Sequence, residues 1–275
     1  MVSNFHLPPV GFGPGSQPEE DEELGYMQLP SGMRTYESHL PDVADSTAVA
    51  PAIALLVRVA AAASACAGAG RACFDLSELD AQNRALIAET MGQGEVAMKI
   101  RGIPALMVQE SVFAGVWCVA GAGVDRIEVA PVPSAAQSRA FEPFRRAGGA
   151  GLATPPGVVN APALLAELLD KSAAYEGGAA HVINLTLLPH TEEDLAWLAE
   201  ALGEGAVTVL SRGYGNCRIT ATATPHVWRV QFFNSTDALI LDTFEVTAMP
   251  EVVLAAREDL EDSAERLREV LEAIR

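Results

Sequence analysis

HVINLTLLPHTEEDLAWLAEALGEGAVTVLSRGYGNCRITATATPHVWRVQFFNSTDALILDTFEVTAMP, residues 181–250, is the stretch that decides the fold of this 275-residue chain. Its pattern predicts a strand, an amphipathic helix that begins near Thr191, and then a series of strands. Thr191 and Asp194 have the spacing of a capping box, with Asp in place of the usual Glu. The helix is therefore expected to start at Thr191.

An earlier part of the chain repeats this stretch in degenerate form. An offset of 111 residues places Trp228 on Trp117 and the Arg-Gly pair at 212–213 on the pair at 101–102. The same offset relates three further pairs: Gly203 and Gly92, Gly205 and Gly94, and Val207 and Val96. Self-similarity of this kind predicts two structural units built alike from one ancestral half.

Each copy has the same predicted order of elements. The first element is a helix, at 52–63 in the first copy and at 162–173 in the second, and a strand follows it. A second helix then starts near Asp80 or Thr191 and ends at a glycine. Three or four strands of an antiparallel meander complete each copy. The fold class is therefore α+β, with two tandem, internally duplicated α/β units and a C-terminal amphipathic helix. That last helix is expected to start at Pro250 and to pack on the sheet of its own unit.

Composition changes along the chain predict the domain organisation. Residues 1–50 carry eight Asp or Glu against one Arg and are rich in Gly and Pro, which is typical of a mobile acidic arm. The first α+β repeat is expected over 51–133 and the second, with the terminal helix, over 162–275. The Gly- and Pro-containing segment 134–161 between them, which holds Arg139, Arg145 and Arg146, is predicted to be a linker.

Charge and cysteine content exclude several functional classes. The net charge of −18 repels nucleic acid and anionic membrane surfaces, so neither is expected as a partner. The four cysteines, at 66, 73, 118 and 217, include no C-x-x-C pair and indicate reduced thiols. The N-terminus lacks the pattern of a secretory signal, and charged or helix-breaking residues interrupt the Ala-rich run 48–69. A cytoplasmic location is expected.

Positions at which the two copies differ are the best candidates for function. The second copy has Tyr-Gly-Asn-Cys-Arg at 214–218 where the first has Ile-Pro-Ala-Leu-Met at 103–107. A loop of this composition can present polar side chains and backbone donors to a partner, although a Gly-Asn hairpin turn explains it equally well. The predicted partner-binding residues are Ser211, Arg212, Tyr214, Asn216, Cys217 and Arg218, with Phe113 in the first copy as a second candidate that is expected to be exposed.

Chemistry at Cys217 or at the histidines is a weaker interpretation. Arg212 and Arg218 lie near Cys217 in sequence and could activate its thiol, but a small buried cysteine in a strand is the commoner case. His181 and His190 have no cysteine or carboxylate at ligand spacing, so no metal site, catalytic residue or cofactor is predicted.

Several of these runs resemble a known family. HVINLTLLP, DLAWL, VTVLSRGYGNCRIT, VWRVQFFNS, LILDTFEV and PEVVLAAREDLEDSAERL are similar to the C-terminal conserved region of the HupH/HyaF hydrogenase expression/formation proteins. GPGSQPEE and LPSGMRTY resemble the N-terminal arm of that family, so the likeness covers nearly the whole chain.

The resemblance implies an accessory protein rather than an enzyme. Members are regarded as chaperones for maturation of an uptake [NiFe]-hydrogenase, which bind the iron–sulfur small-subunit precursor before assembly and export and work with a thioredoxin-like partner. Two alternatives stay open at this point: a thiol-dependent redox protein or enzyme that uses Cys217, and transient carriage of an iron–sulfur cluster by the four cysteines.

Overall fold

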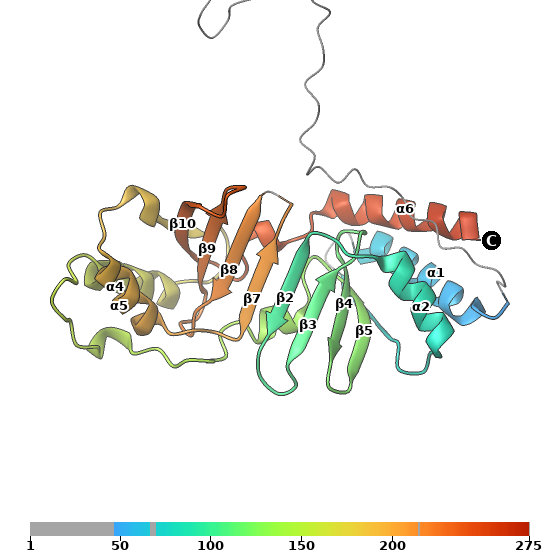
Figure 1. Ribbon diagram of the computed structural model, residues 1–275, viewed down its shortest axis with the longest axis horizontal. Coiled ribbons are helices and arrows are strands. Elements are labelled where there is room, and N and C mark those ends of the chain that lie inside the picture. The colour runs from blue at the N-terminus through green and yellow to red at the C-terminus, as the bar shows by residue number, and fades with distance from the viewer. Residues whose placement is uncertain (1–46, 67–69, 214, 275) are drawn as a thin grey trace, which may run out of the picture. The chain divides into compact units, whose positions relative to one another are not determined.

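The computed structural model describes residues 47–66, 70–213 and 215–274. The predicted arm, at residues 1–50, lies almost entirely outside these ranges. The first repeat consists of α1 (Ala50–Cys66), β1 (Ala72–Asp75), α2 (Ala81–Met91), β2 (Val96–Ile100), β3 (Leu106–Glu110), β4 (Val116–Gly121) and β5 (Val124–Val129). The second consists of α4 (Ala161–Ala173), β6 (His181–Asn184), α5 (Glu192–Leu202), β7 (Val207–Ser211), β8 (Asn216–Ala221), β9 (Val227–Phe233) and β10 (Leu239–Val246). The predicted fold class is confirmed (Figure 1).

Short elements occupy the rest of the described chain. α3 (Ser134–Ser138) and a 3-10 turn at Gly149–Gly151 lie in the segment predicted as a linker, and further 3-10 turns form at Leu185–Leu187 and Glu251–Val253. α6 (Arg257–Ile274) completes the described chain. Within the described residues, no helix combines the length and the apolar character that crossing a membrane requires.

One antiparallel sheet of ten strands runs through both repeats, in the order β1-β5-β4-β3-β2-β7-β8-β9-β10-β6. The repeats meet where β2 pairs with β7, with Met98 opposite Val209 and with Val96 opposite Ser211. Met98 and Val209 are themselves related by the offset of 111, so a local two-fold axis passes between them. The repeats therefore associate as the two subunits of a symmetric dimer do, but within one chain and one compact unit.

The tryptophans identified from the sequence occupy equivalent places in the two repeats. Trp117 and Trp228 are both fully buried. The indole Nε1 of Trp117 donates a hydrogen bond to the carbonyl oxygen of Ala130 at 2.9 Å, and that of Trp228 donates to Thr247 at 3.2 Å. Ala130 is the residue after the end of β5, which pairs with the strand of Trp117, β4. Thr247 is the residue after the end of β10, which pairs with the strand of Trp228, β9. The predicted duplication is confirmed at the level of single hydrogen bonds.

The second helix of each repeat begins with matching caps. The side chain of Asp80 accepts the backbone N–H of Asn83, and the side chain of Thr191 accepts that of Asp194. The capping box predicted at Thr191 is present in full. Although burial by itself raises the pKa of Asp194, hydrogen bonds from four backbone N–H groups, those of residues 159, 160, 161 and 191, lower it to about 2. Asp194 thereby ties the start of α4 to the start of α5.

Both of these helices end at a glycine with positive φ, Gly92 at 55° and Gly203 at 67°. Their ψ angles, −151° and −171°, are extended rather than left-handed helical, so the chain leaves each helix directly toward the next strand. A side chain at Gly203 would also meet the backbone of the segment 145–147. Glycine is required at this position for both reasons.

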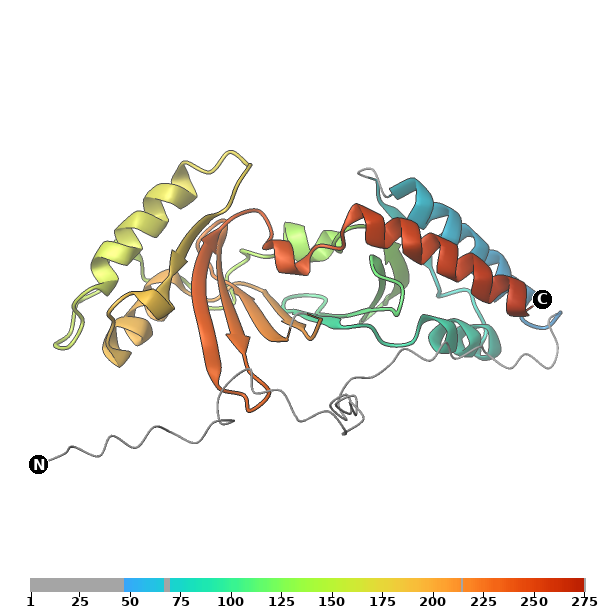
Figure 2. The same ribbon diagram turned by 90° about the horizontal axis from the view of Figure 1, so that it is seen from above.

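The sheet has two faces with different coverings. α1 and α2 pack over Phe74 and Ile127 at one end of the first face, and α4 and α5 pack over Ile183 and Phe244 at the other end (Figure 2). The opposite face, which carries both buried tryptophans, is covered by α3, its flanking residues and the turn at Glu251–Val253. The middle of the first face lies between the two helical layers and exposes side chains from β2, β3, β7 and β8, namely Lys99, Met107, Leu210 and Arg218.

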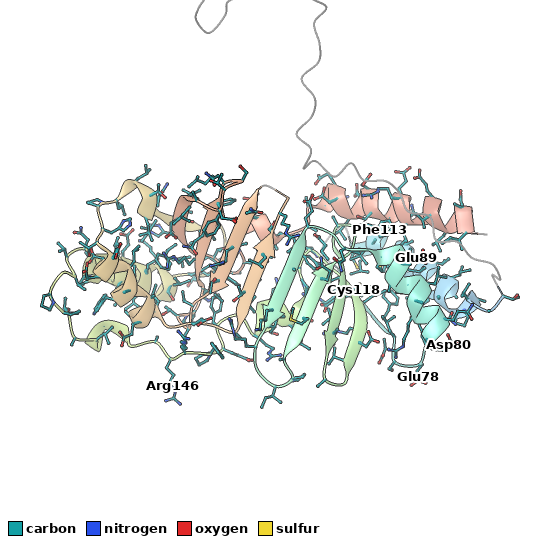
Figure 3. The ribbon with its side chains drawn as sticks, viewed as in Figure 1. Glu78, Asp80, Glu89, Phe113, Cys118 and Arg146 are labelled. Carbon is teal, nitrogen blue, oxygen red and sulfur yellow. The ribbon has the colours of Figure 1, made fainter. Side chains whose placement is uncertain are left out.

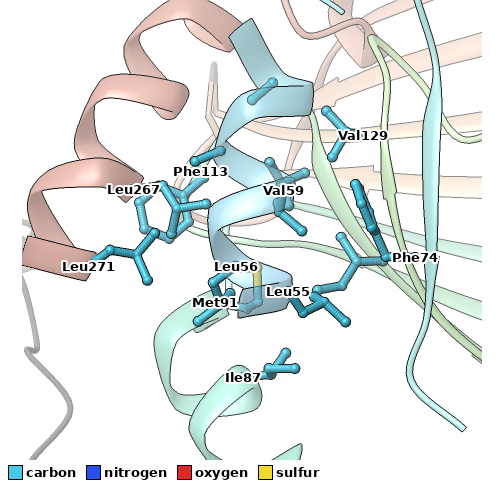
Figure 4. Packing of buried hydrophobic residues seen from close by; sticks show 14 of the residues in the cluster. Leu55, Leu56, Val59, Phe74, Ile87, Met91, Phe113, Val129, Leu267 and Leu271 are labelled. Carbon is cyan, nitrogen blue, oxygen red and sulfur yellow. The ribbon is translucent and has the colours of Figure 1, made fainter. Parts of the chain in front are cut away.

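The C-terminal helix differs from its prediction in start and in partner. Residues 251–253 form a 3-10 turn, and α6 begins only at Arg257. Its buried leucines at 260, 267 and 271 join the core of the first repeat, against α1 and Phe113, instead of the sheet of the second (Figure 4). The expectation that the helix packs on its own unit is wrong, because an apolar stripe shows that one face is buried but does not identify what buries it.

Glu110, beside this helix, is a buried carboxyl group. Its side chain is 8% exposed, and its Oε1 accepts the backbone N–H of Gly115 at 3.2 Å. Burial, together with the nearby charges of Glu95 and Asp259, raises the pKa of Glu110 to about 7, although hydrogen bonds from the backbone N–H groups of Gly115 and Val96 lower it. The folded protein therefore binds the proton of Glu110 more tightly than the unfolded chain does. The free energy of unfolding falls as the pH rises from about 4.5 to 7, because over this range the unfolded chain loses the proton and the folded protein keeps it.

Glu110→Gln is expected to raise the free energy of unfolding by about 3 kcal/mol at pH 8, because the amide keeps the acceptor oxygen and removes the buried charge. The difference from the natural chain should shrink toward pH 5, where folded Glu110 is already neutral. Urea denaturation at pH 5, 6.5 and 8 measures it, with Glu272→Gln on the exposed face of α6 as the control. An equal difference at all three values would contradict a titrating Glu110.

Candidate functional site

The predicted loop connects the antiparallel strands β7 and β8. Ser211 and Cys217 pair across it and are both buried, at 3% exposure each, whereas Arg212, Asn216 and Arg218 are exposed. Tyr214 lies outside the described residues. Asn216 is the first residue of β8, so Gly215 and Asn216 do not by themselves form the turn between the two strands. Three of the predicted residues are exposed, and their role in binding a partner stays a prediction.

Cys217 does not have the surroundings of a reactive thiol. It lies in the core cluster that contains Trp228, and burial raises the pKa of its thiol to about 12, with the charge of Glu245 contributing in the same direction. A thiol that is protonated at neutral pH is a poor nucleophile. The residue acts here as a small core side chain.

Phe113 is also part of a core. It is 1% exposed, within the cluster formed by α1, α2 and α6, and the guanidinium group of Arg266 lies over its ring at 5.6 Å. The expectation that Phe113 is exposed is wrong. A turn held by Ser111, whose Oγ accepts the backbone N–H of Phe113, directs the ring inward beneath α6.

A second hairpin beside the predicted loop is longer in the second repeat than in the first. In the first repeat, Val116 of β4 pairs with Val129 of β5, and in the second repeat the equivalent pair is Val227 of β9 with Val246 of β10. Val227 lies 111 residues after Val116, but Val246 lies 117 residues after Val129. The β9–β10 hairpin therefore contains six additional residues. It projects beyond the rest of the sheet in Figure 2. The additional residues expose Leu239 and Ile240, at 48% and 56%.

The two hairpins of the second repeat adjoin each other. Asn216 Nδ2 donates to Asp237 Oδ1 at 3.5 Å, and the guanidinium group of Arg218 lies 5.6 Å from the centre of the Phe233 ring. Asn234 Oδ1 accepts the backbone N–H groups of Thr236 and Ala238, which fixes the turn between β9 and β10. We refer to the exposed residues 212, 216, 218, 239 and 240 as the hairpin surface.

A pocket of about 470 Å³ opens next to this surface, between α5 and the strands β8, β9 and β10. Arg218, Arg229 and Gln231 line it from the strands, and Arg145 and Arg146 line it from the chain segment that follows α3. At the positions of Arg218, Arg229 and Gln231, the first repeat has Met107, Cys118 and Ala120. These three lining positions are therefore polar in the second repeat and apolar or weakly polar in the first.

Some of these arginines are fixed by carboxylates and others are not. Arg229 forms a two-point ion pair with Asp242, at 3.0 and 2.6 Å, and the side chain of Arg145 lies 3.6 Å from Glu204. Among the described residues, no carboxylate lies within ion-pair distance of Arg146 or Arg218. Figure 3 shows Arg146 extending away from the fold into solvent. Two guanidinium groups of the pocket therefore remain available to an anion.

The remaining cysteines do not gather into a cluster site. Cys66 is buried, Cys73 is exposed, and Cys118 is partly buried with its pKa raised by burial to about 11. Over the described ranges, no three His, Cys, Asp or Glu side chains are grouped so that they could hold a metal ion.

Sequence reasoning identified Arg218 but missed its neighbours in the pocket. Arg145 and Arg146 were visible as a basic cluster, but nothing in the sequence placed that segment beside β8. Arg229 and Gln231 could have been found from the sequence. Alternate residues of a strand lie on the same face of the sheet, and at these two positions the second copy is polar, whereas the first copy has Cys118 and Ala120.

Comparison with known proteins identifies the family. The model of the "HupH hydrogenase expression protein, C-terminal conserved region" matches twice, at residues 49–143 and 158–274, once for each repeat. The chain is 82% identical to a hydrogenase expression/formation protein HupH of Rhodobacter capsulatus over the full length of both, and 35% identical to the hydrogenase-1 operon protein HyaF of Escherichia coli over 71% of each. A solved structure of a hydrogenase expression protein HupH from Thiobacillus denitrificans is 35% identical, with a TM-score of 0.37, and covers 42% of this chain and 94% of its own. As its sequence motifs predicted, the chain belongs to the HupH family of hydrogenase expression proteins.

Proposed function

We propose that the protein is an accessory protein for the maturation of an uptake [NiFe]-hydrogenase, and that it binds the iron–sulfur small-subunit precursor in the cytoplasm before assembly and export. Family membership supports the maturation role, since its relatives carry the names of hydrogenase expression/formation proteins. A thioredoxin-like maturation protein is proposed as a second partner.

The hairpin surface is the observation that carries the proposal. It combines exposed Leu239 and Ile240 with the cations Arg212 and Arg218. Arg212 has a counterpart in Arg101 of the first repeat, but Asn216 and Arg218 are replaced there by Ala105 and Met107, and the additional residues of the β9–β10 hairpin are missing. Apolar side chains exposed together beside polar ones are typical of a surface that binds another protein. A chaperone must also release its client, and a small mixed surface of this kind suits moderate affinity.

The thiol-dependent alternative is disfavoured by the position of Cys217 in the core and by the raised pKa of its thiol. Cluster carriage is disfavoured because the two buried cysteines, Cys66 and Cys217, belong to different core clusters. An accessory role requires neither a thiolate nor a bound metal.

Arg212→Ala, Asn216→Ala and Arg218→Ala, combined in one chain, are expected to reduce capture of the small-subunit precursor at least tenfold in an anaerobic pull-down. All three side chains are exposed, so their removal should leave the fold intact. A second bait, the thioredoxin-like protein of the same operon, tests whether that partner uses the same surface.

The matched control for this pull-down is Arg268→Ala, which removes an exposed cation from α6 in the first repeat's core layer. Cys217→Ser separates the alternatives, since the accessory role predicts unchanged capture and maturation as long as the variant folds. Undiminished capture by the triple variant, with the control also unchanged, would exclude the hairpin surface as the binding site.

A further inference from the structure

We propose that the pocket between α5 and β8–β10 binds an acidic side chain of an extended protein segment through Arg146 and Arg218. This inference is independent of the small-subunit proposal, because it concerns the chemistry of the pocket and not the identity of the partner. It rests on the fixed geometry of the pocket, on its charge and on its apolar wall.

The segment that carries Arg146 is held in place on both sides. The backbone N–H of Arg145 donates to the carbonyl oxygen of Glu204 at 2.9 Å, and the N–H of Glu204 donates back to Arg145 at the same distance. The N–H of Gly148 donates to Glu200 at 3.0 Å. Arg146 therefore extends from a chain segment that is bound to the end of α5.

The floor of the pocket is equally ordered. Arg229 is fixed by its two-point ion pair with Asp242, and Gln231 Nε2 donates to the same carboxylate at 3.3 Å. Arg218 lies on the same face of the sheet, since its strand position is directly opposite Gln231. Arg229 and Gln231 are thus held in place before a ligand binds, which reduces the entropy cost of binding, whereas the exposed side chain of Arg146 has to turn toward the pocket (Figure 3).

The charge of the pocket contrasts with that of the chain. Four arginines, Arg145, Arg146, Arg218 and Arg229, line it, and the carboxylates that face them are Glu200 and Glu204, with Asp242 beneath Arg229. Glu204 is shared between Arg145 and Arg101, at 3.6 and 3.1 Å. A local excess of positive charge remains in a protein whose net charge is −18, and this excess favours an anionic ligand.

A carboxylate suits this pocket better than a phosphate does. The C-terminal end of α5, at Leu202 and Gly203, lines one side, and the partial negative charge of a helix C-terminus opposes a densely charged anion. Arginine pairs with a planar carboxylate through two parallel hydrogen bonds. Ala196, Leu202 and Phe244 supply an apolar wall for the carbon atoms of an adjoining peptide. A peptide with alternating acidic and small apolar side chains satisfies both requirements.

Fluorescence anisotropy with a fluorescein-labelled peptide of four Glu-Ala repeats tests the proposal on the full-length protein. Arg146→Ala with Arg218→Ala is expected to weaken binding of this peptide at least tenfold, and the corresponding lysine substitutions should weaken it less, since lysine keeps the charge and loses the two-point geometry. A Gln-Ala peptide of the same length should not bind.

Controls separate a specific pocket from general attraction. Arg257→Ala with Arg268→Ala changes the net charge by the same amount on the exposed side of α6 and should leave peptide affinity unchanged. The proposal is overturned if this control weakens binding as much as the pocket variant, if the Gln-Ala peptide binds equally well, or if inorganic phosphate binds through the two arginines and the peptide does not bind.

Discussion

Trp228→Ala is expected to lower the free energy of unfolding by about 3–5 kcal/mol, as large-to-small substitutions of buried aromatic residues do. The indole is fully buried beneath α3 and the turn at Glu251–Val253, and its Nε1–H has a buried acceptor at Thr247. Its loss creates a cavity and leaves that carbonyl oxygen without a partner. For a chain of this size, the melting temperature should fall by roughly 10 °C.

Trp117→Ala tests whether the two repeats are energetically as well as geometrically alike. Trp117 has the same burial and the equivalent hydrogen bond, to Ala130, so its replacement should lower the stability by a similar amount. Chemical denaturation of both variants measures the comparison, with Met107→Ala on the open sheet face as the control. A loss below about 1 kcal/mol in either variant would show that its cavity collapses or that the packing differs from that described.

Leu267→Asp is expected to detach α6 and to unfold the first repeat. Leu267 is fully buried in the core with α1 and Phe113, and an unpaired carboxylate at that position combines a lost apolar contact with a large desolvation cost. These two costs together lower the free energy of unfolding by more than about 5 kcal/mol, which is comparable with the total stability of an ordinary domain.

Hydrogen exchange of the amides in α1 and β4 measures this effect, since both elements lie in the core that α6 completes. Protection there should be lost in Leu267→Asp and kept in Glu269→Ala, which changes an exposed residue of the same helix. Protection in α5 should decrease much less, because its cluster contains no residue of α6. Unchanged protection of α1 would mean that α6 does not stabilise the first repeat.

Local patterns predicted the elements of this fold well. Helical periodicity identified α1, α4 and α5, the capping residues fixed the start of α5, and the offset between Trp117 and Trp228 revealed the duplication. These signals succeeded because each depends on residues that are close in sequence or on a comparison of the chain with itself. The family also followed from the sequence, through runs of residues in the second repeat.

Long-range associations could not be predicted in the same way. The alternating patterns at 96–100 and 207–211 suit an edge strand as well as a central one, so the pairing of β2 with β7 was not visible. The apolar stripe of α6 suits either repeat. The exposure of Phe113 was misjudged because the helix that covers it comes from the other end of the chain.

The candidate site was predicted only in part for the same reason. Of the residues predicted in and beside the loop, Arg212, Asn216 and Arg218 are exposed in the structure. The contribution of Arg146 depends on a backbone pairing between the segment around Arg145 and Glu204, which no local pattern indicates. The partner-binding role of this surface stays a prediction until the pull-down is done.

The packing of α6 against α1 also has a consequence for synthesis on the ribosome. Domains usually fold from the N-terminus as they emerge, but here the first repeat lacks one wall of its core until α6, more than 120 residues later in the chain, has been translated. The apolar side of α1 therefore stays accessible to cellular chaperones and proteases throughout elongation. A product that terminates before residue 257 lacks α6 and cannot bury this side of α1 in the same way.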